Sequence, residues 1–247
     1  MAFAVSAVFA VQTMHLKAIL CDIEGTTTSV EFAQKVLFPI SYERMESFIH
    51  ENCGIDLVRN EIEEVKTRIA TAEGKSPDQV TPAEVIATLR SWIEQDKKEG
   101  LLKSIQGKIW KESFESGKIK GHVYPDVPEC FRQWKQLGLI ISIFSSGSIE
   151  AQELIFKYSE AGDLTPYLHS YFDTTTGPKK EAASYHTIAV KLSLKTEEIL
   201  FLSDVTAELD AAQSAGMQTT LLVREGQTPP SNNQHRVATS FHNVILT

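Results

Sequence analysis

Short apolar runs, each followed at once by polar or charged residues, most limit what this chain can fold into. The runs, each rich in Ile, Leu, Val or Phe, are LKAIL (16–20), LIISIF (139–144), EILFL (198–202) and TTLLV (219–223). Strands that are apolar along their whole length are typical of parallel sheets with helices on both faces. We therefore expect these runs to be strands of one buried sheet.

Amphipathic helices are predicted between the later runs. Apolar residues recur every three to four positions in 127–138, 149–162 and 206–216. The first of these segments ends in Gly138, a residue that commonly terminates helices. Strands that alternate with helices predict an α/β fold with a doubly wound, mostly parallel sheet.

The segment 31–120 differs, because it contains no convincing strand. Helical spacing marks the stretches 40–52, 55–70 and 81–102. We predict an all-helical cap in 31–120, inserted directly after the first strand of a core formed by 16–30 and 121–247. The Pro/Asn-rich segment 227–236 is predicted to be a loop.

The first fifteen residues are apolar, but no Lys or Arg precedes the apolar run. The run is shorter than the ~20 residues of a membrane-spanning helix, and a secretory signal has a charged start. We expect residues 1–15 to be an N-terminal extension without fixed structure, with Met14 as an alternative start. A targeting remnant and an additional ordered strand remain alternatives.

The charge balance bears on possible partners. The formal net charge is −8 and the isoelectric point about 5.4, which argues against nonspecific binding to nucleic acid or anionic membranes. A phosphorylated small molecule remains compatible, because a site can be locally positive. Nothing in the sequence indicates an obligate assembly, so we expect a monomer.

The cysteines bear on the compartment. Cys21, Cys53 and Cys130 are far apart and form no CxxC pair, so neither a disulfide framework nor a thiolate metal site is indicated. A reducing compartment is the simplest expectation, which means the cytoplasm, with the nucleus also possible in a eukaryote.

Polar residues that follow the apolar runs form a candidate site. Ligands of an open parallel sheet bind beyond the carboxyl ends of its strands, so these residues are expected to converge. They are Asp22 and Glu24 in DIEGTTT, Ser145 and Ser146 in SSGS, Ser203 and Asp204 in SDVTAELD, and the pair Lys179-Lys180.

Such a cluster suits phosphoryl chemistry. Carboxylates at 22, 24 and 204 would repel one another, and Mg²⁺, which prefers oxygen ligands, resolves that conflict. The serine hydroxyls and one lysine offer donors to a phosphate. One acid can attack phosphorus, while another protonates the leaving oxygen and later activates water.

Each residue also has a purely structural explanation. Asp22 and Asp204 can cap or belong to loops, SSGS can be a turn, and the lysine pair can be solvated. Their joint occurrence after successive apolar runs favours a functional site. Glu208 is a weaker candidate, because a helix face explains it, although it lies one turn after Asp204 and can support it.

The sequence resembles the haloacid dehalogenase-like hydrolase superfamily. DIEGT stands where most phosphatases of that superfamily have Asp-x-Asp-x-Thr, and Glu24 is the departure. This departure resembles the enolase-phosphatases of methionine salvage, also called acireductone synthases. The likeness spans residues 16 to about 226 and includes DIEGTTT, KVLFP (35–39), 105–127, 145–156, 162–177 and 198–217.

The resemblance implies roles for individual residues. Asp22 would be the nucleophile and Glu24 the acid/base, and these two with Asp204 would hold one Mg²⁺ per subunit. Ser145, Ser146 and Lys179 would bind the substrate phosphate; Gly177-Pro178-Lys179 fits the family's Gly-x-Lys pattern.

The resemblance also implies a substrate. It is 2,3-diketo-5-methylthiopentyl-1-phosphate, which is enolised and then dephosphorylated to the acireductone 1,2-dihydroxy-3-keto-5-methylthiopentene plus phosphate. The helical cap would close over the site. Phe32, Leu37, Phe38 and Trp110 are candidates to hold the methylthio tail, with plain core packing as the alternative. The sequence does not indicate which residue removes the proton in the enolisation.

Other functions remain open at this point. One is a phosphatase of the same superfamily that acts on another small phosphorylated metabolite and lacks the enolase step. A second is a catalytically silent binding protein, which the sequence opposes because no expected carboxylate is missing. A dehalogenase is the weakest alternative, since that reaction needs neither the second acid nor the metal.

Overall fold

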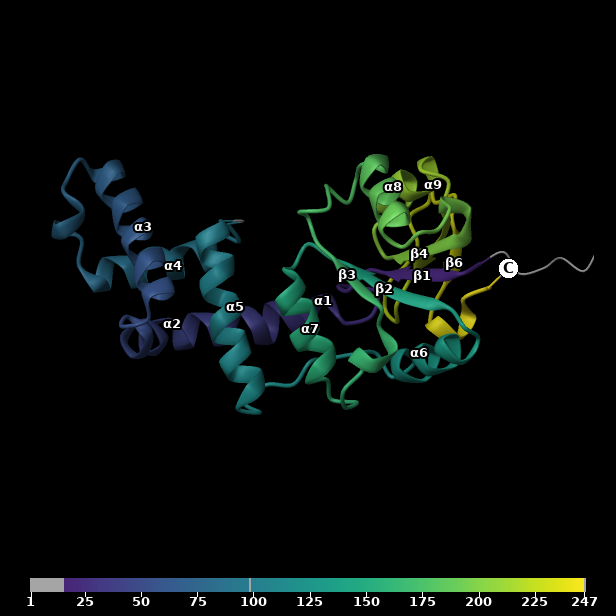
Figure 1. Cartoon of the computed structure of the whole chain (residues 1–247), viewed down its shortest axis with the longest axis horizontal. Helices are drawn as coiled ribbons and strands as arrows, with labels where there is room; N and C mark the ends of the chain where they lie inside the picture. The colour runs from purple at the N-terminus through teal and green to yellow at the C-terminus, as the bar shows by residue number, and fades with distance from the viewer. Residues whose placement is uncertain (1–15, 98, 247) are drawn as a thin grey trace, which may run out of the picture.

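The computed structural model describes residues 16–97 and 99–246. The predicted extension at 1–15 therefore lies outside the described residues. Figure 1 shows an elongated molecule in which a sheet with helices on both faces stands beside a group of helices. No helix in the described residues is both long and apolar enough to cross a bilayer.

All neighbouring strands of the sheet run parallel, in the order β3-β2-β1-β4-β5-β6. The strands are β1 (Ala18–Cys21), β2 (Ile140–Phe144), β3 (Ser170–Phe172), β4 (Ile199–Ser203), β5 (Gln218–Leu222) and β6 (Arg236–Ala238). The predicted α/β class and the strands at the apolar runs are confirmed. The sequence did not indicate β3 and β6, which are three residues long and partly exposed, so neither forms an apolar run.

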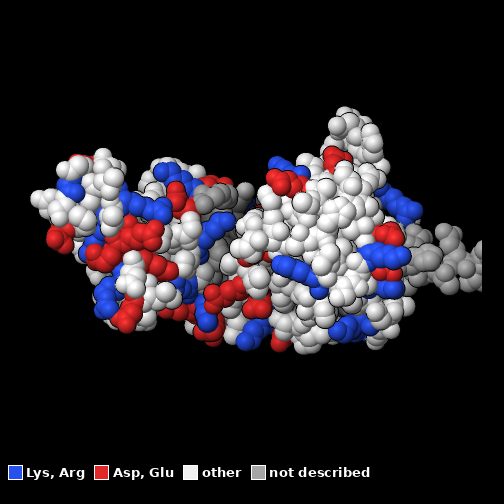
Figure 2. Space-filling model, turned by 45° about the horizontal axis from the view of Figure 1, so that its top comes forward, with Lys and Arg blue, Asp and Glu red and all other residues white. Residues whose placement is uncertain are grey.

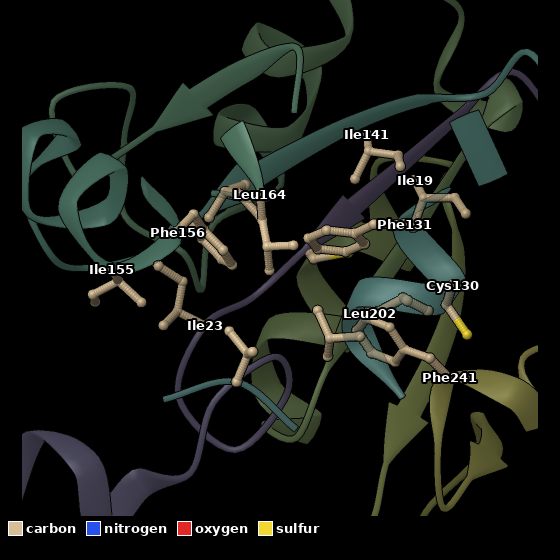
Figure 3. Close-up of a cluster of buried hydrophobic side chains, with 14 of the residues drawn as sticks. Ile19, Ile23, Cys130, Phe131, Ile141, Ile155, Phe156, Leu164, Leu202 and Phe241 are labelled. Carbon is tan, nitrogen blue, oxygen red and sulfur yellow. The ribbon is translucent and has the colours of Figure 1, made fainter. Parts of the chain in front are cut away.

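Alternate residues of β1 face the two sides of the sheet. Ile19 and Cys21 join a buried cluster with α6 (Val127–Gln136) and α7 (Ile149–Lys157). Figure 3 shows part of this cluster, with Phe131 lying among Ile19, Ile141 and Leu164. The side chain of Phe131 is fully buried, and burial of this kind contributes about 1.5–3 kcal/mol.

The opposite side of the sheet is covered by α8 (Ala182–Lys191) and α9 (Thr206–Ser214). Ala18 and Leu20 of β1 pack there with Tyr185 and Leu209. The sequence analysis identified α9 but did not identify α8. Because β1 is buried on both sides, its carboxyl end is held in a fixed position.

The helical part is built from longer helices than those beside the sheet. After α1 (Val30–Phe32) and a π-helical turn (Ala33–Leu37), it contains α2 (Phe38–Asn52), α3 (Asp56–Glu73), α4 (Pro82–Glu94) and α5 (Gly100–Glu115). It has its own buried cluster, which includes Met45, Phe48, Val65, Leu89 and Ile105. A separate core is consistent with an independent unit, and the boundaries 16–30, 31–120 and 121–247 stay a prediction.

The predicted helical stretch 81–102 is two helices. Thr81 and Glu84 form a capping box at the start of α4, with the Glu84 carboxylate accepting from the Thr81 N–H at 2.7 Å. The chain leaves α4 after Glu94 and passes through Asp96, whose φ of +48° is incompatible with a continuous helix. α5 then begins at Gly100.

The chain segments that join the two parts lie side by side. The Tyr124 N–H donates to the Thr27 carbonyl at 3.0 Å, and the Ser29 N–H donates to Nδ1 of His122 at 3.1 Å. The buried Arg224 guanidinium pairs with Asp126 at 2.7 Å and also donates to the Thr26 carbonyl. These contacts fix the loop that follows β1.

Charges are mixed on the visible surface. On the face in Figure 2, Lys and Arg side chains are interspersed with Asp and Glu, and the largest acidic group lies on the helical part.

Candidate functional site

The candidate site lies at the carboxyl ends of β1 and β4. Here the strand order switches, because β2 and β3 lie on one side of β1 and β4 to β6 lie on the other. Asp22 follows β1 and Asp204 follows β4, and these strands are neighbours. Such a switch point is where open α/β sheets bind ligands. A cavity of about 210 Å³ lies there. Its lining includes all the predicted site residues, namely Asp22, Glu24, Ser145, Ser146, Lys179 and Asp204, together with Glu208.

A buried lysine connects two carboxylates in this cavity. Lys179 Nζ lies 2.6 Å from Asp22 Oδ1 and 2.7 Å from Glu208 Oε2. Burial alone would lower the pKa of Lys179, but the charges of Asp22 and Glu208 outweigh that effect and raise the pKa. Lys179 therefore remains a cation throughout the neutral range, as a phosphate-binding lysine must.

The Asp22 carboxylate is held from several directions. Its own following residue, Ile23, donates an N–H to Oδ1 at 2.7 Å. Ser203 Oγ lies 3.0 Å from Asp22 Oδ2 and 3.2 Å from Glu208 Oε2. With Lys179 on Oδ1, these contacts orient a carboxylate that is only 4% exposed.

Burial and like charge raise the pKa of Asp204 and of Glu208. The pKa of Asp204 rises to about 7, first because of burial and then because Asp22 is near. The pKa of Glu208 is raised by the same two causes in the same order. A cavity that resists ionising its acids in this way favours a positively charged ligand.

Gly25 allows the close approach of Asp204 to the loop after β1. Its φ is +70°, and a Cβ at this position would lie 2.0 Å from Asp204 Oδ2. Only glycine permits both this conformation and this contact.

The serine loop is shaped by its own hydrogen bonds. The Gly147 N–H donates to Ser145 Oγ at 3.2 Å. Nε2 of the buried Gln152 donates to the carbonyls of Gly147 and Phe172 at 2.8 and 2.9 Å. Ser145 is buried while Ser146 is exposed, so the two hydroxyls differ in their access to a ligand.

The structure distinguishes the two adjacent lysines. The Lys179 side chain is 9% exposed, whereas Lys180 is exposed and does not line the cavity. The Tyr185 hydroxyl donates to the Lys179 carbonyl at 2.6 Å and fixes the backbone there. Gly177, with φ of +142°, packs against Ser184, and a Cβ would lie 2.3 Å from Ser184 Oγ.

A second cavity, of about 350 Å³, adjoins the first. Glu24 and Ser146 line both cavities. Phe38 and Trp110, two of the candidates for the substrate tail, line the second cavity as well. The other candidates, Phe32 and Leu37, are 6% and 5% exposed and belong to the buried cluster of the sheet.

The predicted metal ligands need a separate test. In residues 16–97 and 99–246, no three His, Cys, Asp or Glu side chains are grouped to hold a metal ion, so the ligand set of Asp22, Glu24 and Asp204 stays a prediction. Mg²⁺ is commonly bound by only one or two carboxylates, with waters and substrate phosphate completing its shell. The neighbouring acids Asp22 and Asp204 fit that requirement, because the charge of Asp22 helps to raise the pKa of Asp204 and a cation between them would relieve that repulsion.

The sequence analysis did not identify some contributors. Ser203 was noted only by position, and its contact with Asp22 depends on the pairing of β1 with β4. Glu208 was expected only as a weaker candidate that could support Asp204, whereas it shares Lys179 with Asp22. The signal for Glu208 was its spacing of one helical turn from Asp204.

Known proteins resemble this chain over most of its length. The model of the haloacid dehalogenase-like hydrolases matches residues 16–216. Enolase-phosphatase E1 of Sorangium cellulosum is 44% identical over 228 residues, covering 92% of this chain and 97% of that protein. Enolase-phosphatase E1 of Pseudomonas aeruginosa strain UCBPP-PA14 is 46% identical over 234 residues, covering 94% and 100%.

Solved structures agree on the fold. The UTR4 protein of Saccharomyces cerevisiae superimposes with a TM-score of 0.76 at 31% identity, covering 93% of this chain and 100% of that chain. A phosphatase from Thermococcus onnurineus gives a TM-score of 0.57 at 17% identity, covering 92% and 95%, and at that identity shows the shared fold alone. The chain belongs to the haloacid dehalogenase-like hydrolases and, within them, to the enolase-phosphatases.

Proposed function

We propose that this protein is a Mg²⁺-dependent enolase-phosphatase, or acireductone synthase. It converts 2,3-diketo-5-methylthiopentyl-1-phosphate into 1,2-dihydroxy-3-keto-5-methylthiopentene and phosphate. The observation that carries the proposal is the joining of two cavities at Glu24 and Ser146, one lined by acids and Lys179, the other largely apolar. The enolase-phosphatases that resemble the chain over more than nine-tenths of its length support the same activity.

The acidic cavity suits the phosphatase half of the reaction. Asp22 attacks phosphorus, the ester P–O bond breaks, and Glu24 gives a proton to the leaving oxygen. Glu24 then takes a proton from water, which attacks phosphorus and releases phosphate from Asp22. Lys179 and the serine loop neutralise and orient the phosphoryl oxygens.

Asp22 and Asp204 are the side chains that would hold Mg²⁺ in this site, with Glu24 as the predicted third ligand. The cation, when bound, withdraws charge from the transferring phosphoryl group. Enolase-phosphatases and their superfamily generally use Mg²⁺, and one ion per subunit is proposed here.

The apolar cavity suits the methylthio tail. Phe38 and Trp110 supply apolar wall, and the indole N–H of Trp110 is already bound to the Leu37 carbonyl at 2.8 Å. The helices that contribute this wall act as the cap that excludes water during the reaction. We further propose a monomeric enzyme in the cytoplasm.

The test is turnover of the diketone phosphate with and without Mg²⁺, following enol absorbance and free phosphate together. We expect the enol to appear before phosphate in the wild type, and no phosphate from Asp22→Asn. Release of phosphate without an enol intermediate would mean that the protein is a phosphatase without enolase activity. If Asp22→Asn released phosphate at the wild-type rate, another residue would be the nucleophile.

A further inference from the structure

We propose that Gln106 and Lys103, side by side on α5, bind and polarise the carbonyl oxygens of the substrate during enolisation. This role rests on the proposed function and adds residues for the enolase step, which the phosphate-binding cluster does not supply. Both residues line the apolar cavity, away from the acids that surround Lys179.

One face of α5 forms the polar part of the cavity wall. Positions 103, 106 and 110 follow the spacing of three and four residues that places side chains on the same side of a helix, and all of them line the cavity. In Figure 1, α5 lies beside α7, the helix that follows the serine loop. The face therefore lines the same cavity as Ser146, where the substrate phosphate is proposed to bind.

The Gln106 side-chain amide lines the cavity and has no protein hydrogen-bond partner within residues 16–97 and 99–246. The residue is 5% exposed. By contrast, the equally buried Gln152 donates to two carbonyls. The amide atoms of Gln106 are accessible from the cavity, because Gln106 lines it and its atoms are not among the fully buried ones that lack a partner. A carbonyl oxygen of a bound ligand can therefore accept a hydrogen bond from the Gln106 amide.

Lys103 differs from the other lysines of α5. Lys108 lies 2.7 Å from Glu61, and Lys111 lies 3.2 Å from Glu150. Lys103 is partly buried and pairs with no carboxylate in residues 16–97 and 99–246. It therefore presents a positive charge to the cavity one turn before Gln106.

Enolisation needs such donors. A C–H bond next to a carbonyl breaks, and its proton moves to a carboxylate; Glu24 and Asp96 are those that line this cavity. The electron pair of that bond forms C=C, and the carbonyl π pair moves to oxygen. The enolate oxygen then takes a proton from water as the carboxylic acid returns one. Donors placed around the developing oxyanion accelerate this step.

The experiment separates enolisation from phosphate release. Enol formation from the diketone phosphate is compared with hydrolysis of p-nitrophenyl phosphate, an ester that needs no enolisation, in Gln106→Leu, Lys103→Met and Lys103→Arg. We expect kcat for enol formation to fall roughly 100-fold in the first two variants, with much smaller changes in KM. Aryl phosphate hydrolysis stays near the wild-type rate, and Lys103→Arg recovers most of the enol formation.

The control is Lys66→Met, which removes a lysine of α3 that lies outside the cavity. Wild-type enol formation by both Gln106→Leu and Lys103→Met would overturn the proposed role. An equal fall in both activities, or a rise in KM alone, would also overturn it. If the wild type itself forms no enol from the diketone phosphate, the proposed function fails first, and no variant is needed to see this.

Discussion

The raised pKa of Asp204 predicts how the stability of the metal-free protein changes with pH. As the pH falls from 7 to 4, the wild type should gain unfolding free energy relative to Asp204→Asn. The pKa is 3.8 in the unfolded chain and about 7 in the folded protein. Between these values the folded state binds the proton more tightly than the unfolded state. The contribution of Asp204 is therefore fully present below pH 3.8 and is lost as the pH rises to about 7.

The size of this effect follows from the same two values. They differ by roughly three pH units, and at about 1.4 kcal/mol per unit the full effect is about 4 kcal/mol. Solvent screening of a partly exposed carboxyl reduces it to about 2–3 kcal/mol. Asp204→Asn has no charge to bury, so it should become more stable relative to wild type by that amount between pH 4 and 7.

The assay is urea unfolding at several pH values in EDTA, followed by circular dichroism. Asp78→Asn is the matched control, because Asp78 is an exposed carboxylate outside the site. Saturating Mg²⁺ at pH 7 should stabilise the wild type by about 2.7 kcal/mol at 100 times its Kd and have a smaller effect on Asp204→Asn. A pH-independent difference between wild type and Asp204→Asn would refute the reasoning from burial and like charge.

Other consequences are more direct. Gly25→Ala places a Cβ 2.0 Å from a carboxylate oxygen, so phosphatase kcat should fall at least ~100-fold, and steady-state kinetics near the wild-type rate would contradict this. Phe131→Ala should lower the unfolding free energy by about 3–5 kcal/mol in urea titrations; a loss below about 1 kcal/mol would mean that the cluster in Figure 3 repacks. Burial raises the pKa of Cys130 to about 11, so iodoacetamide at pH 8 should label the exposed Cys53 first, as peptide mass mapping would show. Early labelling of Cys130 would contradict its burial.

The sequence was most informative where one local pattern implies one structure. An apolar run followed by acids can be identified without knowing its neighbours, so β1, β4 and the residues after them were predicted. β6 was missed because Arg236 and Val237 are exposed, and its pairing with β5 depends on distant parts of the chain. α8 was missed although Tyr185, Ile188 and Ala189 of its buried face follow the helical spacing of three and four residues.

The site shows the same division. Asp22, Glu24 and Asp204 were found because each follows a predicted strand, whereas the pairing of Lys179 with Glu208 requires two segments to meet in space. The position of the Gln106 amide in the cavity wall could not be predicted either, because it depends on tertiary contacts and many glutamines in helices are simply solvated. Sequence periodicity identifies the face of a helix, but it does not reveal which polar group on that face lacks a partner.

The adjacent joining segments have a consequence for protein engineering. Residues 26–29 and 121–126 enter and leave the helical part side by side, and they are tied by Tyr124, His122 and Arg224. The helical part has its own buried cluster. A chimera that exchanges the helices between these ties therefore needs only two nearby splice points. The sheet and its acids would be kept while the shape of the apolar cavity, and so the choice of substrate, is replaced.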